Sequence, residues 1–284
     1  MKATFLLDNL LGKLSFLNQA VSARTQLPAL SGFLLEAEKG KLKITATDLE
    51  IGISISIPAS VEEEGKAVVP ARPFSELLAT LSEEKITVEK KEKNISVSGK
   101  KTKASLLSLD ETDFPNILDE KGEKTITIKK DSVVRDFSKV AFAAAQDSGR
   151  PAFSGILLKA EKEGILMVAT DSHRLSKKIS SGARSAKPFD KPILIPSRTI
   201  KTLLVNKSDE DVDLCVSEKN NQVIFYQGDT VLAGRLIDAE YPEFEKIIPT
   251  DSSTRTEFDR QEMQNALKTA EIFARDNANI VRLS

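Results

Sequence analysis

The chain has 284 residues, of which 40% are hydrophobic and 29% charged, a composition typical of a globular protein with two to three domains. Its 41 basic and 42 acidic residues leave a formal net charge of −1, so the plain basic excess of many nucleic-acid-binding proteins is absent, although a balanced total can conceal a basic and an acidic face. Neither an apolar run near 18 residues nor a secretion signal occurs, so neither export nor membrane spanning is indicated, and the single cysteine fits a reducing cytosol.

Helix and strand patterns alternate along the first part of the chain. A helix is predicted after Asp8, its expected N-cap, with apolar residues at helical spacing: Leu10, Leu11, Leu14, Leu17 and Val21. Strands are expected over 32–37 and 41–46, joined by a turn at Lys39-Gly40, followed by a helix over 71–81 and strands over 85–88 and 94–98.

The same order of patterns then returns. Residues 28–48 match residues 151–171 at a constant offset of 123, with twelve of 21 positions identical, so a whole domain is repeated. In the second copy a helix is expected from Asp131, with one face formed by Val134, Phe137, Val140, Ala141 and Ala144. Strands over 155–160 and 164–169, a helix over 197–205 and strands over 211–216 and 222–226 follow.

Two polar, turn-rich stretches mark boundaries, at residues 117–124 and 249–256. They predict three domains: 1–122, 123–248 and 249–284. The last begins like a third copy, with Asp259 as a helix cap and Met263, Ala266, Leu267 and Ala270 at helical spacing. A third copy equal to the others would need about 90 further residues, and we therefore expect the sequence to be truncated or a fragment.

No constellation of residues predicts catalysis. The single Cys215 lies in an alternating, strand-like run and is expected to be half-buried or buried. With one Cys and one His, His173, a metal cluster of His or Cys ligands is excluded, and no cofactor is expected. Residues 98–102 resemble a phosphate loop only faintly and are better explained as a hairpin turn. Asp48 and Asp171 occupy equal places in the two copies, which favours a repeated structural role in a turn.

Six motifs in order and register resemble the bacterial sliding clamp, the beta subunit of DNA polymerase III. They are Leu27-Pro28, Ala46-Thr47-Asp48-Leu49-Glu50, Val69-Pro70-Ala71-Arg72, Asp113-Phe114-Pro115-Asn116, Val168-Ala169-Thr170-Asp171-Ser172-His173-Arg174-Leu175 and Tyr241-Pro242. The resemblance implies an α+β DNA-clamp fold of tandem domains, each with two helices and antiparallel sheets. It further implies a non-catalytic processivity factor of DNA replication, a homodimeric ring around duplex DNA in the cytoplasm, at the nucleoid.

Two sets of residues correspond to the sites of that family. Sliding without base recognition needs cations that face phosphates. The residues expected near DNA are Arg24, Arg72, Gln146, Arg198 and Lys201, with Lys13, Arg135 and Lys139 as further candidates on helix faces. For single lysines a solvated helix face is an equal explanation, and the pairing of Arg72 with Arg198 across the copies also suits a structural role at a helix start.

The second set would bind a short peptide with a Gln and two apolar anchors, carried by the polymerase alpha subunit, the clamp loader and other replication proteins. Its members are Phe153, Thr170, Ser172, His173, Arg174, Leu175, Pro242, Lys246 and Ile247. The copies share Thr-Asp and then diverge, which suits a site in one domain only; ordinary loop drift is the alternative. Ser172 replaces a frequent Gly, Lys246 a frequent Arg and Ala152 a bulkier residue, and the family's C-terminal residues, which complete this pocket, are missing.

Two other functions remain open from the sequence. A hydrolase could use His173 with Asp171, and it would lose turnover when His173 is replaced by Ala. A clamp-like regulator could bind the replication peptide without ever closing a ring.

Overall fold

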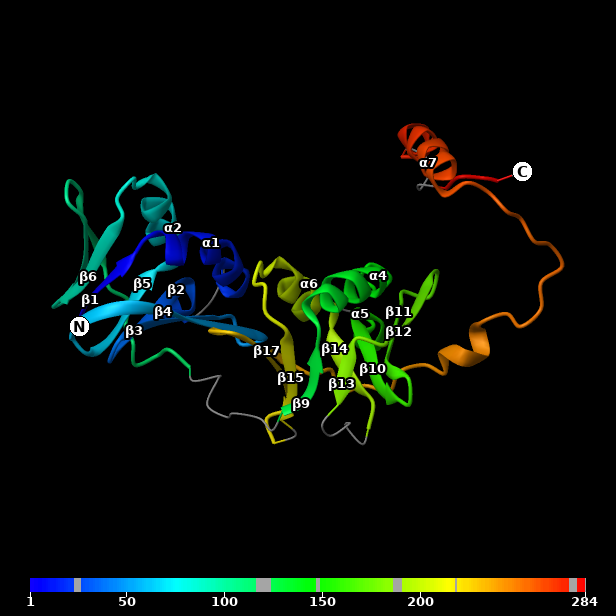
Figure 1. Ribbon diagram of the computed structural model, residues 1–284, viewed down its shortest axis with the longest axis horizontal. Coiled ribbons are helices and arrows are strands. Elements are labelled where there is room, and N and C mark those ends of the chain that lie inside the picture. The colour runs from blue at the N-terminus through cyan, green and yellow to red at the C-terminus, as the bar shows by residue number, and fades with distance from the viewer. Residues whose placement is uncertain are drawn as a thin grey trace. The chain divides into compact units, whose positions relative to one another are not determined.

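The computed structural model describes residues 1–22, 27–115, 124–146, 149–185, 191–217, 219–275 and 280–283. Its internal contacts divide it into two compact units, Met1–Tyr241 and Pro242–Ser284, each described by itself. The first unit contains both copies of the repeat. Each copy runs through helix, strands, helix and strands, as the sequence predicts, and a further strand precedes the first helix of each copy (Figure 1).

The first copy begins with β1 (Lys2–Leu6), α1 (Asp8–Leu17) and two short 3-10 turns, η1 (Asn18–Ala20) and η2 (Pro28–Ser31). Its remaining elements are β2 (Gly32–Glu38), β3 (Lys41–Thr47), β4 (Ile51–Glu63), β5 (Gly65–Pro70), α2 (Ala71–Thr80), β6 (Lys85–Lys91), β7 (Asn94–Ser98) and β8 (Lys103–Leu107). The hairpin predicted at residues 98–102 joins β7 to β8, where Gly99 N–H donates to the Thr102 carbonyl at 2.9 Å.

The second copy begins with β9 (Lys124–Ile128) and a helical stretch of three parts, α3 (Lys130–Ser132), η3 (Val133–Phe137) and α4 (Ser138–Ala141). Its remaining elements are α5 (Pro151–Ser154), β10 (Gly155–Glu161), β11 (Gly164–Thr170), β12 (Leu175–Ser180), β13 (Ala183–Ser185), β14 (Ile193–Pro196), α6 (Ser197–Val205), β15 (Val212–Ser217), β16 (Gln222–Gln227) and β17 (Thr230–Arg235). Cys215 is buried in β15, as expected.

Antiparallel pairing joins the two copies directly. β17 of the second copy pairs with β4 of the first, from Thr230 opposite Ile55 to Gly234 opposite Ile51. One sheet therefore continues across the junction in the order β13-β9-β15-β16-β17-β4-β1-β6-β7-β8, with β2, β3 and β5 attached through β4. A second sheet, β12-β11-β10-β14, belongs to the second copy. The α+β class with antiparallel sheets is confirmed.

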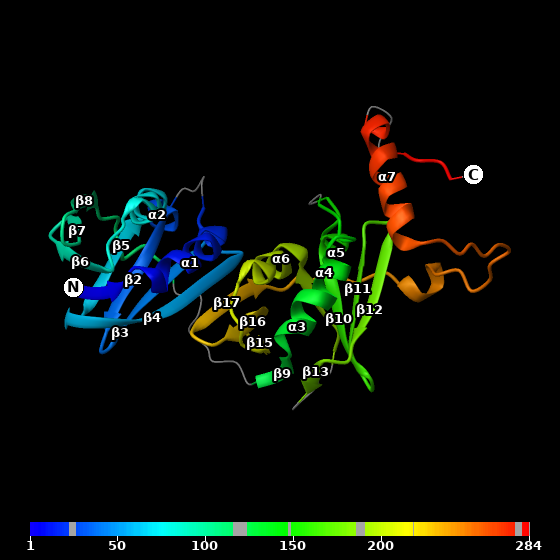
Figure 2. The same cartoon turned by 45° about the horizontal axis from the view of Figure 1, so that its top comes forward.

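The helices cover these sheets with apolar faces. In the first copy Leu10, Leu14 and Leu17 of α1 are buried with Phe74 and Leu78 of α2, because residues three and four apart share one face of a helix. Figures 1 and 2 show α1 and α2 together on one side of the first copy's strands. In the second copy α4 contacts α6, and α1 contacts α6 where the copies meet.

Two sequence predictions about helices are wrong in detail. Residues 133–137 form a π-helix, whose hydrogen bonds span five residues instead of the four of an α-helix; the wider turn shifts the buried face. Val133 is therefore buried, whereas Val134, predicted on the core face, is 50% exposed. The N-cap of α1 is Leu7, and Asp8 is the first helical residue, where its charge still favours the positive end of the helix.

The second unit contains η4 (Phe244–Ile247) and α7 (Arg260–Ala274). Asp259 is the N-cap of α7, as predicted, and its carboxylate accepts N–H hydrogen bonds from Gln261 and Glu262 at 2.8 and 2.9 Å. Within this unit the apolar residues of α7 are largely exposed, and only Ala274 is buried. Among the described residues no helix combines the length and hydropathy needed to cross a membrane.

Candidate nucleic-acid interface and partner site

One hydrogen-bonded turn occurs in both copies at the predicted Thr-Asp motif. In the second copy Thr170 Oγ1 donates to the Arg174 carbonyl at 2.7 Å and accepts from Ser172 N–H at 3.1 Å. Asp171 Oδ1 accepts from the N–H groups of His173 and Arg174 at 3.0 and 2.9 Å. These four bonds satisfy the backbone of the loop between β11 and β12.

The first copy repeats all four bonds at the offset of 123. Thr47 Oγ1 donates to the Ile51 carbonyl at 2.8 Å and accepts from Leu49 N–H at 3.0 Å. Asp48 Oδ1 accepts from Glu50 and Ile51 N–H groups at 3.1 and 2.9 Å. The structural role predicted for the paired aspartates is thus confirmed.

The third residue of each turn adopts a left-handed backbone conformation. Leu49 has φ of 76° and Ser172 has φ of 78°, a region that disfavours residues with a Cβ. Both turns therefore store strain, which the side-chain hydrogen bonds of Thr and Asp offset. Glycine, which has no Cβ, is the residue that this geometry favours at both positions.

Residues that differ between the copies surround the second turn. Arg150 donates to Ser172 Oγ at 2.9 Å, and its guanidinium lies 5.1 Å from the centre of the Phe153 ring. Arg174 donates through Nε to Asp171 Oδ2 at 2.9 Å and lies 5.5 Å from the centre of the Phe142 ring. The structure thereby brings Phe153, Thr170, Ser172 and Arg174 into one cluster.

The carboxylate of Asp171 is hydrogen-bonded within its own turn, and these bonds stabilise its charged form. The Arg174 N–H lowers the pKa of Asp171 most, the His173 N–H and the Arg174 side chain lower it further, and partial desolvation opposes them. Both carboxylate oxygens accept hydrogen bonds from the turn itself, and the bond from His173 comes from its backbone. The carboxylate therefore does not orient the His173 imidazole, as a hydrolase would require.

The other predicted peptide-site residues fall into both compact units. His173 is exposed and Leu175 is half-buried at the start of β12. Pro242, Lys246 and Ile247 belong to the second unit, where Lys246 pairs with Glu243 and Ile247 is 62% exposed.

Tyr241 closes the first unit next to this turn. Its hydroxyl donates to the Val168 carbonyl at 3.4 Å, and burial raises its pKa to about 12. The residue that leads into the second unit is therefore anchored on β11.

The paired arginines predicted near DNA occupy the same helical position. Arg72 is the second residue of α2 and Arg198 the second residue of α6, and each helix follows a proline. Their partners differ. Arg72 donates to Glu76 Oε1 on the same helix at 2.8 Å, whereas Arg198 contacts Glu50 and Asp48 of the first copy.

A cavity of about 650 Å³ gathers three of the predicted DNA-site residues at the junction of the copies. Gln146, Arg198 and Lys201 line it together with Arg235 and Glu50. Cations dominate the charged part of this lining, which suits an anionic ligand such as phosphate. Its apolar lining comes from Ile51, Ala145, Pro196, Val205, Leu236 and Ile237.

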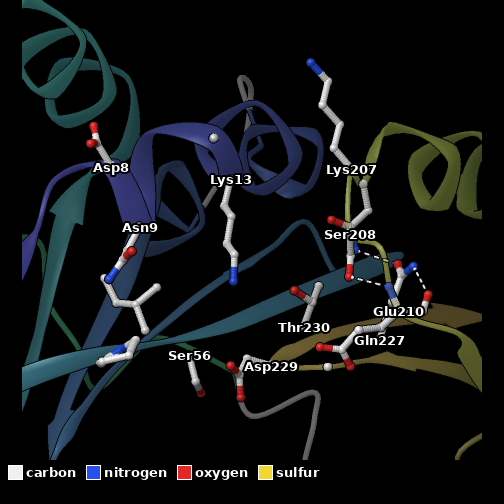
Figure 3. Close-up of a pocket in the computed structure, with 15 residues that line it drawn as sticks. Asp8, Asn9, Lys13, Ser56, Lys207, Ser208, Glu210, Gln227, Asp229 and Thr230 are labelled. Carbon is white, nitrogen blue, oxygen red and sulfur yellow. Dashed lines mark hydrogen bonds between the residues drawn. The ribbon is translucent and has the colours of Figure 1, made fainter.

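The remaining cationic candidates are placed differently. Arg24 lies outside the described residues. Arg135 pairs with the buried Asp136 at 2.9 Å, which occupies its guanidinium on its own helix, and Lys139 is exposed on α4. Lys13 lines a separate groove of about 510 Å³. Figure 3 shows Lys13 extending from α1 toward the strands of that groove, while Lys207 points away from it.

Several contact residues were not predicted from the sequence. They are Arg150 and Phe142, which hold the second turn, and Asp48 and Glu50, which hold Arg198. For Arg150 a signal existed, because the repeat places Leu27 at the equivalent position and an arginine in one copy alone indicates a special role. Among the described residues no group of His, Cys, Asp and Glu is arranged to hold a metal ion.

Comparisons with known proteins agree along the chain. Residues 1–118 match the family model for the N-terminal domain of the DNA polymerase III beta subunit, and residues 127–243 match the model for its central domain. The Beta sliding clamp of Bacillus subtilis (strain 168) is 30% identical over 302 residues, a match covering 100% of this chain and 78% of that protein.

Solved structures show the same relationship. The crystal structure of the Bacillus subtilis sliding clamp superposes with a TM-score of 0.87 at 28% identity, covering 97% of this chain and 74% of that one. A Pseudomonas aeruginosa sliding clamp bound to griselimycin superposes with a TM-score of 0.84 at 25% identity, covering 96% and 74%. The chain therefore belongs to the family of DNA polymerase III beta subunits, the bacterial sliding clamps, which are non-catalytic processivity factors of replication.

Proposed function

We propose that this chain is the sliding clamp of a bacterial replicative polymerase: it encircles duplex DNA without reading its sequence and tethers replication proteins through a peptide site. The observation that carries this proposal is membership of the clamp family over both copies of the repeat. In this proposal the chain is divided into three domains, at residues 1–122, 123–248 and 249–284. Two subunits pair into a ring, which acts in the cytoplasm.

We assign the peptide site to the turn of the second copy. Thr170 and Asp171 fix the loop, while Ser172, His173 and Arg174 present different side chains from those of the first copy. Phe153 and Leu175 supply apolar surface beside it, and Pro242, Lys246 and Ile247 are assigned to the same site. A rigid loop with an apolar neighbourhood and a few polar groups is the usual design of a peptide pocket. The ligands are the polymerase alpha subunit, the clamp loader and other replication proteins that carry a short peptide with a Gln and two apolar anchors.

We assign the DNA contacts to Arg24, Arg72, Gln146, Arg198 and Lys201. Gln146, Arg198 and Lys201 share one cavity, which supports a common ligand for them. A sliding protein needs contacts to phosphate that are weak and independent of sequence.

The peptide assignment is tested by fluorescence anisotropy with a labelled peptide of the type QLxLF. We expect His173→Ala and Leu175→Ala to weaken binding. Glu50→Ala changes the position equivalent to His173 in the first copy and should leave binding unchanged, so it is the matched control. Binding and sedimentation are measured on this chain and on one extended to a complete third domain.

The outcomes separate the competing functions. Dimerisation of the extended chain together with peptide binding supports the clamp. Peptide binding by an extended chain that stays monomeric would favour a regulator without a ring. An extended chain that neither dimerises nor binds the peptide would limit the family relationship to fold.

A further inference from the structure

Arg198 is held at the junction of the two copies by carboxylates from the first. Its NH1 donates to Glu50 Oε2 at 3.0 Å, and its NH2 donates to Asp48 Oδ2 at 2.5 Å and to the Gln19 carbonyl at 3.0 Å. The Asp48 side chain is 12% exposed and that of Arg198 47% exposed. Asp48 is thus largely covered at the junction, whereas about half of the Arg198 side chain remains accessible.

The repeat explains why Asp48 is available to Arg198. In the second turn the equivalent oxygen, Asp171 Oδ2, accepts from Arg174 of the same turn at 2.9 Å. The first copy has Ile51 at the position of Arg174, and this buried side chain cannot donate a hydrogen bond. Arg198 from the next copy takes the place that Arg174 fills in the second turn.

The junction is already tied together by backbone pairing. β4 pairs with β17, and Arg235 N–H donates to the Glu50 carbonyl at 3.0 Å. The ion pairs of Arg198 are therefore not the sole connection between the copies. Their specific effect is to fix the position of the Arg198 guanidinium and to offset its charge in the cavity that it lines with Lys201 and Gln146.

We propose that Asp48 and Glu50 are positioning residues that hold Arg198 ready for a DNA phosphate and weaken its attraction for that phosphate. This inference rests on the proposed DNA contact of Arg198. A guanidinium carries five N–H donors, and the contacts with Asp48, Glu50 and Gln19 use three, which leaves up to two for a phosphate.

A weaker attraction between Arg198 and phosphate is useful for a protein that must slide along DNA. Each strong phosphate contact raises affinity and steepens its salt dependence, whereas a sliding protein gains from contacts that exchange readily. Two carboxylates beside the cation repel an approaching phosphate while they fix the guanidinium in place. Arg72 has one glutamate beside it in the same way, Glu76 on its own helix.

The test measures binding of a short fluorescent duplex at low salt and over a salt series, using the 284-residue chain. Glu50→Gln and Asp48→Asn keep hydrogen-bond acceptors but remove charge, and we expect each to tighten DNA binding about threefold at low salt. The slope of log affinity against log salt should steepen by up to about 0.9. Glu62→Gln makes the same charge change at the ion pair with Lys2, away from the junction, and is the matched control.

A second readout reports positioning without DNA. In a double-mutant cycle of Asp48→Asn and Arg198→Gln, we expect the two substitutions to be coupled about threefold or more in the unfolding equilibrium constant. Additivity of the two substitutions would overturn the positioning role, whatever the DNA result.

The DNA-binding measurements distinguish failure of this inference from failure of the proposed function. If Arg198→Gln weakens DNA binding while Glu50→Gln and Asp48→Asn behave like Glu62→Gln, attenuation by the carboxylates is refuted and the DNA contact stands. If duplex binding is unchanged by Arg198→Gln, Arg198 does not contact phosphate and the inference falls with that assignment. If the chain does not bind duplex at low salt, the proposed DNA function itself is refuted for this chain.

Discussion

Valine in place of Thr47 and Thr170 separates the structural role of the duplicated turn from its binding role. Valine matches threonine in shape but removes the hydroxyl. Each substitution removes one donated and one accepted hydrogen bond, at 2.8 and 3.0 Å in the first turn and at 2.7 and 3.1 Å in the second. The two variants are therefore matched chemically and differ only in which copy they affect.

The magnitude follows from the number of bonds and their burial. A typical intramolecular hydrogen bond contributes about 1 kcal/mol net, so each substitution should lower the free energy of unfolding by about 2 kcal/mol. Thr47 and Thr170 are 0% and 2% exposed, which limits replacement of the lost hydroxyl by water. The strained φ angles of Leu49 and Ser172 then lose part of their support.

The assays are hydrogen exchange of the Leu49 and Ser172 amides, urea unfolding, and anisotropy with the labelled peptide. We expect each variant to lose protection at its own turn, and only Thr170→Val to weaken the peptide, by about fivefold for about 1 kcal/mol of added ordering cost. If Thr47→Val weakened peptide binding equally, the loss would reflect a general destabilisation of the protein and not the turn of the second copy. Unchanged peptide affinity in Thr170→Val, despite lost amide protection, would refute a binding role for this turn.

Three further predictions concern strain, acid stability and the half-buried phenol of Tyr241. Leu49→Gly should raise the free energy of unfolding by about 0.5–1 kcal/mol, measured in urea, because glycine tolerates the left-handed conformation without strain. Burial opposes ionisation of Asp136, but hydrogen bonds from Arg135 and Ser180 outweigh burial and lower the pKa of the carboxyl. The ionised carboxylate therefore stabilises the fold above about pH 4, and this contribution is lost as the pH falls further. The difference in unfolding free energy between wild type and Asp136→Asn should accordingly shrink between pH 7 and pH 3. Ultraviolet titration of wild type against Tyr241→Phe should show a phenol ionising at about pH 12.

Local patterns predicted much of the fold. Strand β7 and helix α6 have the residue bounds expected from apolar spacing and turn residues, and the strands around the two repeated hairpins end within one residue of expectation. These elements follow from period and turn chemistry, which are local properties. The π-helix at residues 133–137 was beyond that reasoning, because its apolar residues also fit the spacing of an ordinary α-helix.

Contacts between the copies were not predictable in the same way. The pairing of β4 with β17 joins residues far apart in sequence, and the extension of one sheet across the junction depends on it. The contact of Arg198 with Asp48 spans 150 positions and depends on that pairing. The resemblance placed Arg198 near DNA but contained no information on its carboxylate partners.

The two copies of the turn share one backbone arrangement but pair their aspartate with different arginines. Thr and Asp are kept in both, because their side chains hold the loop through identical bonds. The three residues after them make no conserved side-chain contact and are therefore free to diverge. In the first copy Glu50 supplies a carboxylate, and Ile51 offers no side-chain donor to Asp48 Oδ2, so this oxygen accepts from Arg198 and the turn joins the two copies. In the second copy Arg174 of the same turn donates to Asp171 Oδ2, and Ser172 and His173 are exposed at the surface. Ile51 in the first turn and Arg174 in the second thus accompany different partners of the aspartate Oδ2, which are Arg198 of the other copy in one case and Arg174 of the same turn in the other.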